Sequence, residues 1–215
     1  MKKHFSILLL LCTLVFPGQK KPDLLLQYSL LHRNYKSNDF KAVESGAYII
    51  DNDEIRINVQ FQDSLSCYVI YKDPENNVAI LYNSAEFTSS DSSGLMFGTT
   101  GTKKVYPPSG EETIYFILSK DRQDKLEKII KDLSKSQGAR AKKFFKRFLS
   151  EIEKIASSKN KRKNIASRLD KPIVGGVSFR GEDDEINLFS LTHKFSAKDV
   201  IVESITLDHL DVKQD

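Results

Sequence analysis

The chain has no tryptophan and only two cysteines in its 215 residues. Cys12 lies in an N-terminal segment that we expect to be removed, which leaves Cys67 alone. A lone cysteine excludes an intrachain disulfide and a zinc knuckle, so stability must come from a hydrophobic core. Beyond the N-terminus, no apolar run approaches the roughly 20 residues that a membrane span needs. The sequence therefore indicates a folded domain without covalent or membrane support.

The N-terminus has the pattern of a secretory signal. A basic head over residues 1–4 precedes a mostly apolar run over residues 5–16, and Pro17 and Gly18 follow. A charged head, a short apolar run and a helix-breaking end are typical of export signals, so residues 1–19 are predicted to be a signal peptide. The alternative is a buried N-terminal helix or strand. Lipidation at Cys12 is a second alternative, disfavoured because Leu11 is larger than the residue that normally precedes a lipidated cysteine. We expect an extracytoplasmic location: periplasmic, envelope-associated or secreted.

The remaining roughly 195 residues suffice for one sizeable domain. Residues 20–45 are predicted to be a connecting segment, in which the apolar stretch 24–31 could be a helix turn or a strand. Residues 46–215 are predicted to form a single β-rich domain.

Strand patterns begin after Gly46. Residues 55–62 alternate between apolar and polar, which indicates a strand with one dry and one wet face. Residues 65–71 are apolar on both faces and predict a central strand, and a turn over 73–77 leads to a third strand over 78–82. These three strands are predicted to form an antiparallel meander.

Further along, residues 83–102 are rich in Ser, Thr and Gly and predict a long loop, with a short strand near 95–97. Additional strands are predicted over 103–106, 112–118, 173–179 (with a kink at Gly175 and Gly176) and 200–207.

Between residues 121 and 157 the apolar period changes from two to that of a helix. Leu126, Ile129, Ile130 and Leu133 form one stripe, capped by Ser119 or Asp121 and ended by Gly138. A second helix follows, and a basic linker is expected over about 158–171. The predicted fold is mainly β (α+β): a β-sandwich or partly open barrel with a two-helix excursion between strands.

Three pieces of the chain resemble a family of exported bacterial modules, the domain of unknown function four-three-eight-four. They are the paired strands 55–59 and 66–71, the strand 79–83 and the segment 108–119. The last is similar to the family's Gly-x-Glu followed by an apolar strand; the chain departs from the family's Leu-Phe-Pro-Asn at Tyr82. The resemblance covers about half of the exported chain and implies export and a β-rich fold, but no catalytic residues.

Few residues suggest catalysis or metal binding. Cys67 and His193 could act as nucleophile and base, but a cysteine between apolar strand residues usually packs as a small hydrophobe. His32, His193 and His209 lack metal-ligand spacing and are expected at the surface or at strand ends. The acidic segments 51–54 and 182–185 are interpreted as solvated turns rather than calcium sites. The segment 98–104 lacks the ending of a phosphate-binding loop.

The basic segment is the feature with most functional content. Residues 139–171 contain twelve Lys or Arg and three Asp or Glu, a local net charge of +9 against +4 for the chain. A basic amphipathic helix can bind an anionic surface, or its apolar face can simply cover a sheet while its cations stay in water. The predicted contact residues are Arg140, Lys142, Lys143, Lys146, Arg147, Lys161, Arg162 and Lys163.

These observations predict an exported, non-catalytic binding or interaction module of the bacterial cell envelope. No catalytic, cofactor or metal residues are assigned. The expected partner is an envelope protein; the alternative is an anionic lipid or polysaccharide surface that binds the basic helix. Nucleic acid is not expected, because no recognition motif is present and the chain is exported. A hydrolase that uses Cys67 is the least favoured reading.

Overall fold

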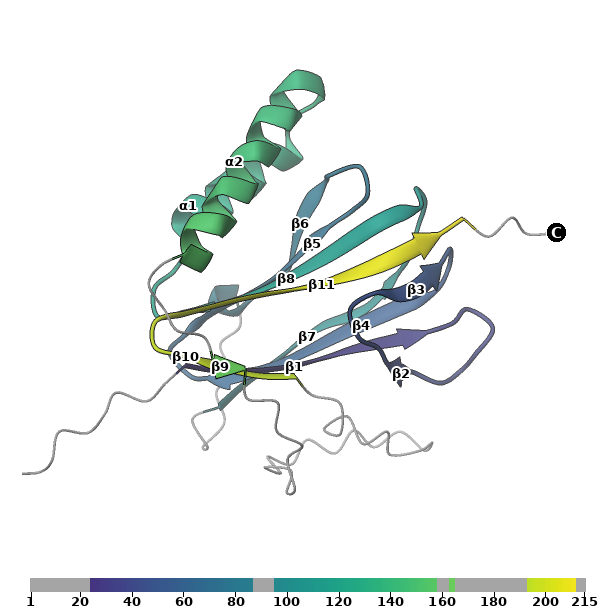
Figure 1. The fold of residues 1–215 in the computed structure, drawn as a ribbon, viewed down its shortest axis with the longest axis horizontal. Coiled ribbons are helices and arrows are strands. Elements are labelled where there is room, and N and C mark those ends of the chain that lie inside the picture. The colour runs from purple at the N-terminus through teal and green to yellow at the C-terminus, as the bar shows by residue number, and fades with distance from the viewer. Residues whose placement is uncertain (1–23, 87–94, 158–162, 165–192, 212–215) are drawn as a thin grey trace, which may run out of the picture.

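Two β-sheets pack face to face, and two helices cover the outer side of one of them (Figure 1). This computed structural model describes residues 24–86, 95–157, 163–164 and 193–211. The sheets do not close into a barrel, so the fold is an α+β sandwich, as predicted.

Sheet A has the strand order β7-β4-β1-β10-β9, and β2 pairs with β1. Its strands are β1 (Leu24–Arg33), β2 (Lys41–Ala42), β4 (Glu54–Gln62), β7 (Leu95–Lys104), β9 (Lys163–Asn164) and β10 (His193–Ala197). Alternate residues of β1 and β4, such as Leu26, Leu30, Ile57 and Phe61, are almost completely buried against sheet B. Period-two alternation thus gives sheet A its dry inner face.

Sheet B has the order β3-β11-β8-β5-β6, followed after β6 by a single 3₁₀ turn (Ser84–Glu86). Its strands are β3 (Ala47–Ile50), β5 (Ser66–Lys72), β6 (Val78–Asn83), β8 (Gly110–Ser119) and β11 (Val200–Leu210). Cys67, Phe116 and Ile201 face sheet A, whereas Tyr68 and Ile117 lie in a second core with the helices. The central strands of this sheet are therefore buried on both faces, which explains why β5 has no polar alternation.

Helices α1 (Asp124–Ser134) and α2 (Gly138–Ser157) form an antiparallel hairpin between β8 and β9. The predicted stripe of α1 is buried in the second core. The residue at its N-cap is Gln123, without a side-chain cap, so the predicted cap by Ser119 or Asp121 is wrong; the Ser119 hydroxyl instead donates to the Asp121 carbonyl. Gly138 has a φ of +56°, which suits the sharp turn before α2. No described helix is long and apolar enough to cross a membrane.

Several sequence expectations need correction. The apolar stretch 24–31, expected to be a helix turn or a strand, is a strand; it belongs to β1, which lies between β4 and β10 rather than in a connecting segment. The predicted meander is also wrong: β5 and β6 pair, but β4 lies in the other sheet, because the chain changes sheets at Asp63 and Ser64. Residues 95–104 form one ten-residue strand rather than a loop with short strands. Several predictions fall on residues that the structure does not describe: the signal peptide with Cys12, most of the linker 158–171, the strand over 173–179 and the acidic turn over 182–185.

Candidate functional site

The structure brings together five of the eight predicted contact residues on helix α2. Arg140, Lys142, Lys143, Lys146 and Arg147 are all exposed in the N-terminal half of the helix. Lys161 and Arg162 lie outside the described residues, and Lys163 belongs to β9 at the edge of sheet A. The candidate site is therefore the first half of α2.

The two halves of α2 differ in burial. Phe148, Ile152 and Ile155 in the second half are buried against sheet B and α1. In the first half, Phe144 and Phe145 are only partly buried, and the turn between α1 and α2 lies at the end of the hairpin that points away from the sandwich (Figure 1). Packing on the sheet thus accounts for the second half of the helix and leaves the first half largely in solvent.

Residues 135–150, which we call the basic tip, contain six cations and no acid. The cations are Lys135, Arg140, Lys142, Lys143, Lys146 and Arg147. No acidic side chain in the described part of the chain pairs with them, whereas Lys125 outside the tip pairs with Glu151. The first turn of α2 contains no acidic residue. Arg140, in the first turn of α2, lies near the positive end of the helix dipole, where a cation costs about 0.3–1 kcal/mol. Lys142 and Lys146, and Lys143 and Arg147, are like-charge pairs four residues apart, so this arrangement does not serve the stability of α2.

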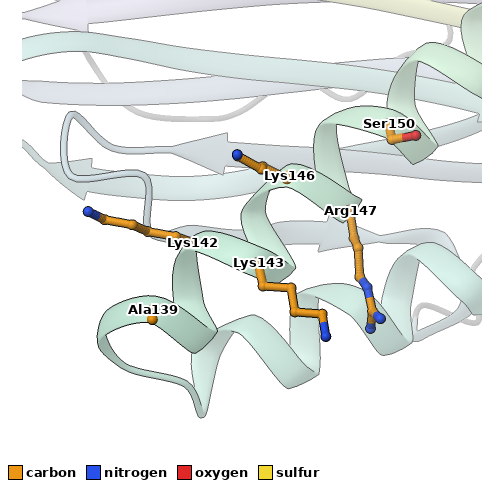
Figure 2. A pocket seen from close by; sticks show the side chains of 6 residues that line it. All are labelled: Ala139, Lys142, Lys143, Lys146, Arg147 and Ser150. Carbon is orange, nitrogen blue, oxygen red and sulfur yellow. The ribbon is translucent and has the colours of Figure 1, made fainter.

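Basic side chains project from successive turns of the tip (Figure 2). A depression of about 480 Å³ is lined by Ala139, Lys142, Lys143, Lys146, Arg147 and Ser150. All six residues belong to α2, so the depression is an open groove along the helix surface rather than an enclosed cavity. An extended anionic chain or a charged surface matches this shape better than a small buried ligand.

One aromatic ring lies within the cationic cluster. The guanidinium groups of Arg140 and Arg147 lie 5.7 and 5.5 Å from the centre of the Phe144 ring. Such contacts orient arginine side chains without neutralising them, so both charges stay available to an anionic partner.

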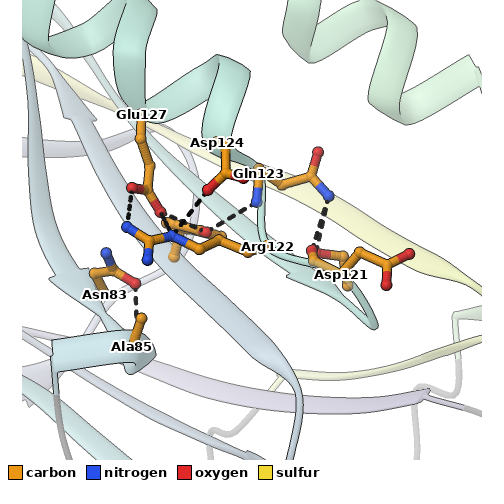
Figure 3. Close-up of polar contacts among 9 residues, drawn as sticks. Asn83, Ala85, Asp121, Arg122, Gln123, Asp124 and Glu127 are labelled. Atoms are coloured by element: carbon orange, nitrogen blue, oxygen red, sulfur yellow. Dashed lines mark hydrogen bonds and ion pairs between the residues drawn. The ribbon is translucent and has the colours of Figure 1, made fainter.

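A polar network fixes the base of the hairpin to sheet B (Figure 3). The buried Tyr68 hydroxyl donates to Glu127 Oε1 at 2.8 Å and accepts the backbone N–H of Gln123 at 3.0 Å. Arg122 donates to both carboxylate oxygens of Glu127 and pairs with Asp124. Burial, together with the Glu127 carboxylate, raises the pKa of Tyr68 to about 12, while the Arg122 hydrogen bond lowers the pKa of Glu127. The orientation of the hairpin is therefore set at its base.

The sequence did not predict a buried cluster around His209. This side chain, expected at the surface or at a strand end, lies near the end of β11 but is only 3% exposed, and its Nε2 lies 2.9 Å from Asp51 Oδ1. The His209 Nδ1 atom lies 3.0 Å from Oε1 of Glu112, but the two atoms do not form a hydrogen bond. The Glu112 residue is 1% exposed. Tyr71 hydrogen-bonds to Glu112, and burial raises the pKa of this carboxyl despite both partners.

The acidic segment 51–54 begins with a turn, as expected, but it is only partly solvated. Asp53 is 1% exposed and accepts hydrogen bonds from the backbone N–H groups of Tyr35 and Ile50 and from Asn34 Nδ2, and it lies 2.6 Å from His32 Nε2. Its oxygens are occupied by protein groups that fix the turn. Among the described residues, no group of three His, Cys, Asp or Glu side chains could hold a metal ion.

Cys67 has the environment of a core residue. It is fully buried on the inner face of sheet B, and burial raises the pKa of its thiol. His193 lies on sheet A, where its ring stacks 5.0 Å from the Tyr28 ring. A nucleophilic cysteine needs a lowered pKa and access to substrate, and this thiol has neither.

The segment 98–104 forms part of β7 and holds no phosphate-binding loop. A Cβ atom at Gly98 would lie 2.3 Å from the Tyr82 ring, so the glycine lets this side chain pack across β7. No family model, curated protein or solved structure matches the chain. The resemblance carried by residues 55–59, 66–71, 79–83 and 108–119 therefore stays a prediction.

Proposed function

We propose that this protein is an exported, non-catalytic binding module of the bacterial cell envelope that contacts an anionic partner through the basic tip. The observation that carries the proposal is the set of six cations on residues 135–150, unpaired within the described chain and displayed where the hairpin projects from the sandwich. Export is supported by the signal-like residues 1–19.

The local energetics support a binding role for the tip. Arg140 opposes the dipole of α2, and the like-charge pairs Lys142–Lys146 and Lys143–Arg147 repel; both effects disfavour the helix. An anionic partner would relieve both effects. The free N–H groups at the start of α2 also favour anions. An acidic envelope protein, anionic lipid or anionic polysaccharide could each supply the charge; the open groove disfavours a small ligand.

The environment of Cys67 disfavours the alternative of a hydrolase that uses this thiol. A hydrolase built on this thiol would have to expose a fully buried sulfur and ionise it against its raised pKa.

Charge reversal tests the proposal directly. The test variant carries Lys142→Glu, Lys143→Glu, Lys146→Glu and Arg147→Glu. The matched control carries four reversals at exposed sites on the sandwich: Lys36→Glu, Lys41→Glu, Lys103→Glu and Lys198→Glu. Both variants change the net charge equally, so a difference between them reports the position of the charges.

Each protein is crosslinked in its own cells and is also sedimented with vesicles of equal parts phosphatidylglycerol and phosphatidylcholine. Each cation near an anionic membrane contributes about 1 kcal/mol, so the test variant should lose vesicle or polymer binding almost completely. Binding of the unaltered protein should also fall at high salt. A single envelope protein that crosslinks to the control but not to the test variant would identify an acidic protein partner. Equal binding by both variants would refute the role of the tip.

A further inference from the structure

A second, more enclosed space lies at the end of the sandwich where β5 and β7 end and β8 begins. Its volume is about 280 Å³. Ile55, Leu81 and Val105 supply apolar walls, and Tyr71 and Tyr106 add two aromatic rings. Unlike the groove on α2, it is lined by residues from both sheets and from the loop after β7, so it is a cavity built by the tertiary fold.

The cavity contains a buried carboxyl group. Glu112 lines it and is 1% exposed. Behind it, His209 lies between Glu112 and Asp51. With Glu112 and Asp51 both ionised, a protonated His209 would balance only one of the two negative charges. Asp73, Lys103 and Lys104 also line the cavity. Burial raises the pKa of Glu112, which indicates that its protein partners do not fully replace water around the charge.

We propose that this cavity binds a small organic monocation, an ammonium group on a short apolar body, with Glu112 as its counter-ion. The apolar walls suit the body, and the aromatic rings of Tyr71 and Tyr106 could attract an ammonium group through cation–π contacts. Lys103 and Lys104 also line the cavity and disfavour a ligand with several positive charges. A metal ion is a poorer match, because no described cluster of three suitable ligands exists.

The probe is n-butylammonium chloride, titrated into the purified protein in a calorimeter at constant ionic strength. n-Butanol serves as the uncharged ligand of the same shape, and sodium chloride as the inorganic cation. The main variant is Glu112→Gln, and its control is Glu111→Gln, the neighbour on β8 whose side chain is 62% exposed. The second pair is Tyr106→Ala and Tyr48→Ala; both tyrosines are 66% exposed, but only Tyr106 lines the cavity.

The expected result is saturable binding of n-butylammonium and none of n-butanol or sodium. Loss of a charged hydrogen-bond partner should weaken binding about tenfold or more in Glu112→Gln. Tyr106→Ala should weaken it several-fold, whereas Glu111→Gln and Tyr48→Ala should bind normally. If Glu112→Gln does not fold, the exposed tyrosine pair decides the test alone. The proposal is overturned if n-butylammonium gives no saturable heat, if n-butanol binds equally well, or if the variants of each pair behave alike.

Discussion

Replacing Tyr68 by phenylalanine removes one oxygen atom from the base of the helical hairpin. The ring is completely buried in the second core, so the apolar packing should survive the substitution. What is lost is the hydrogen bond to Glu127 Oε1 at 2.8 Å and the one from the Gln123 N–H at 3.0 Å. Tyr68→Phe therefore isolates the polar contribution of this junction to stability.

The expected cost follows from the two bonds. A hydrogen bond to a charged group contributes about 1.5–3 kcal/mol and a neutral one about 0.5–1.5 kcal/mol. Glu127 keeps both bonds from Arg122, and the Gln123 N–H lies in a partly exposed site that water can reach, so part of the loss is recovered. We expect the free energy of unfolding to fall by about 2 kcal/mol.

Urea unfolding followed by circular dichroism measures this loss, and hydrogen exchange of α1 amides reports whether the hairpin loosens before the sandwich. Tyr48→Phe is the control, because Tyr48 is 66% exposed and its hydroxyl stands in water. A loss below about 0.5 kcal/mol in Tyr68→Phe, or an equal loss in the control, would refute the assigned role of the hydroxyl.

Three further predictions concern single residues. The pKa of Glu127 is lowered in the folded protein, so its contribution to stability should be complete above the unfolded pKa and lost as the pH falls through the folded pKa. On acidification, the urea midpoint of the unaltered protein should therefore drop more steeply than that of Glu127→Gln. Parallel curves for the two proteins would contradict this. Cys67 should not react with a thiol-directed probe in the native protein but should react in urea; rapid native labelling would restore the hydrolase alternative. Gly98→Ala should lower stability by about 1–3 kcal/mol, because the new Cβ would meet the Tyr82 ring; an unchanged thermal midpoint would show that the ring moves freely.

Local patterns predicted the elements of the fold better than their arrangement. A polar–apolar alternation or a helical stripe reports the buried face of a single element. Strand β4 confirms the strand predicted over 55–62, and α1 confirms the helix predicted from Leu126, Ile129, Ile130 and Leu133. The partner of a strand is not encoded locally. Asp63 and Ser64 are typical turn residues, and they suit equally a turn back to pair with β4 and a crossing into the other sheet. The sequence therefore could not distinguish the predicted meander from the observed change of sheet.

The two candidate sites differ in the same way. The basic tip is contiguous in sequence, so its charge was visible before the structure was known. The cluster at the second site joins Asp51, Glu112 and His209 from three separate segments, and each residue alone has an ordinary surface explanation. A buried charge becomes evident only when the fold supplies both its partner and its exclusion from water.

Because the central strands of sheet B are buried on both faces, the hairpin also shields an apolar surface from water. If α1 and α2 moved away, Tyr68, Ile70, Ile117 and Val202 would form a continuous apolar surface on an otherwise intact sandwich. Exposed patches of this kind promote self-association. Substitutions at the base of the hairpin should therefore reduce solubility before they unfold the domain. This couples the display of the basic tip to the solubility of the whole protein.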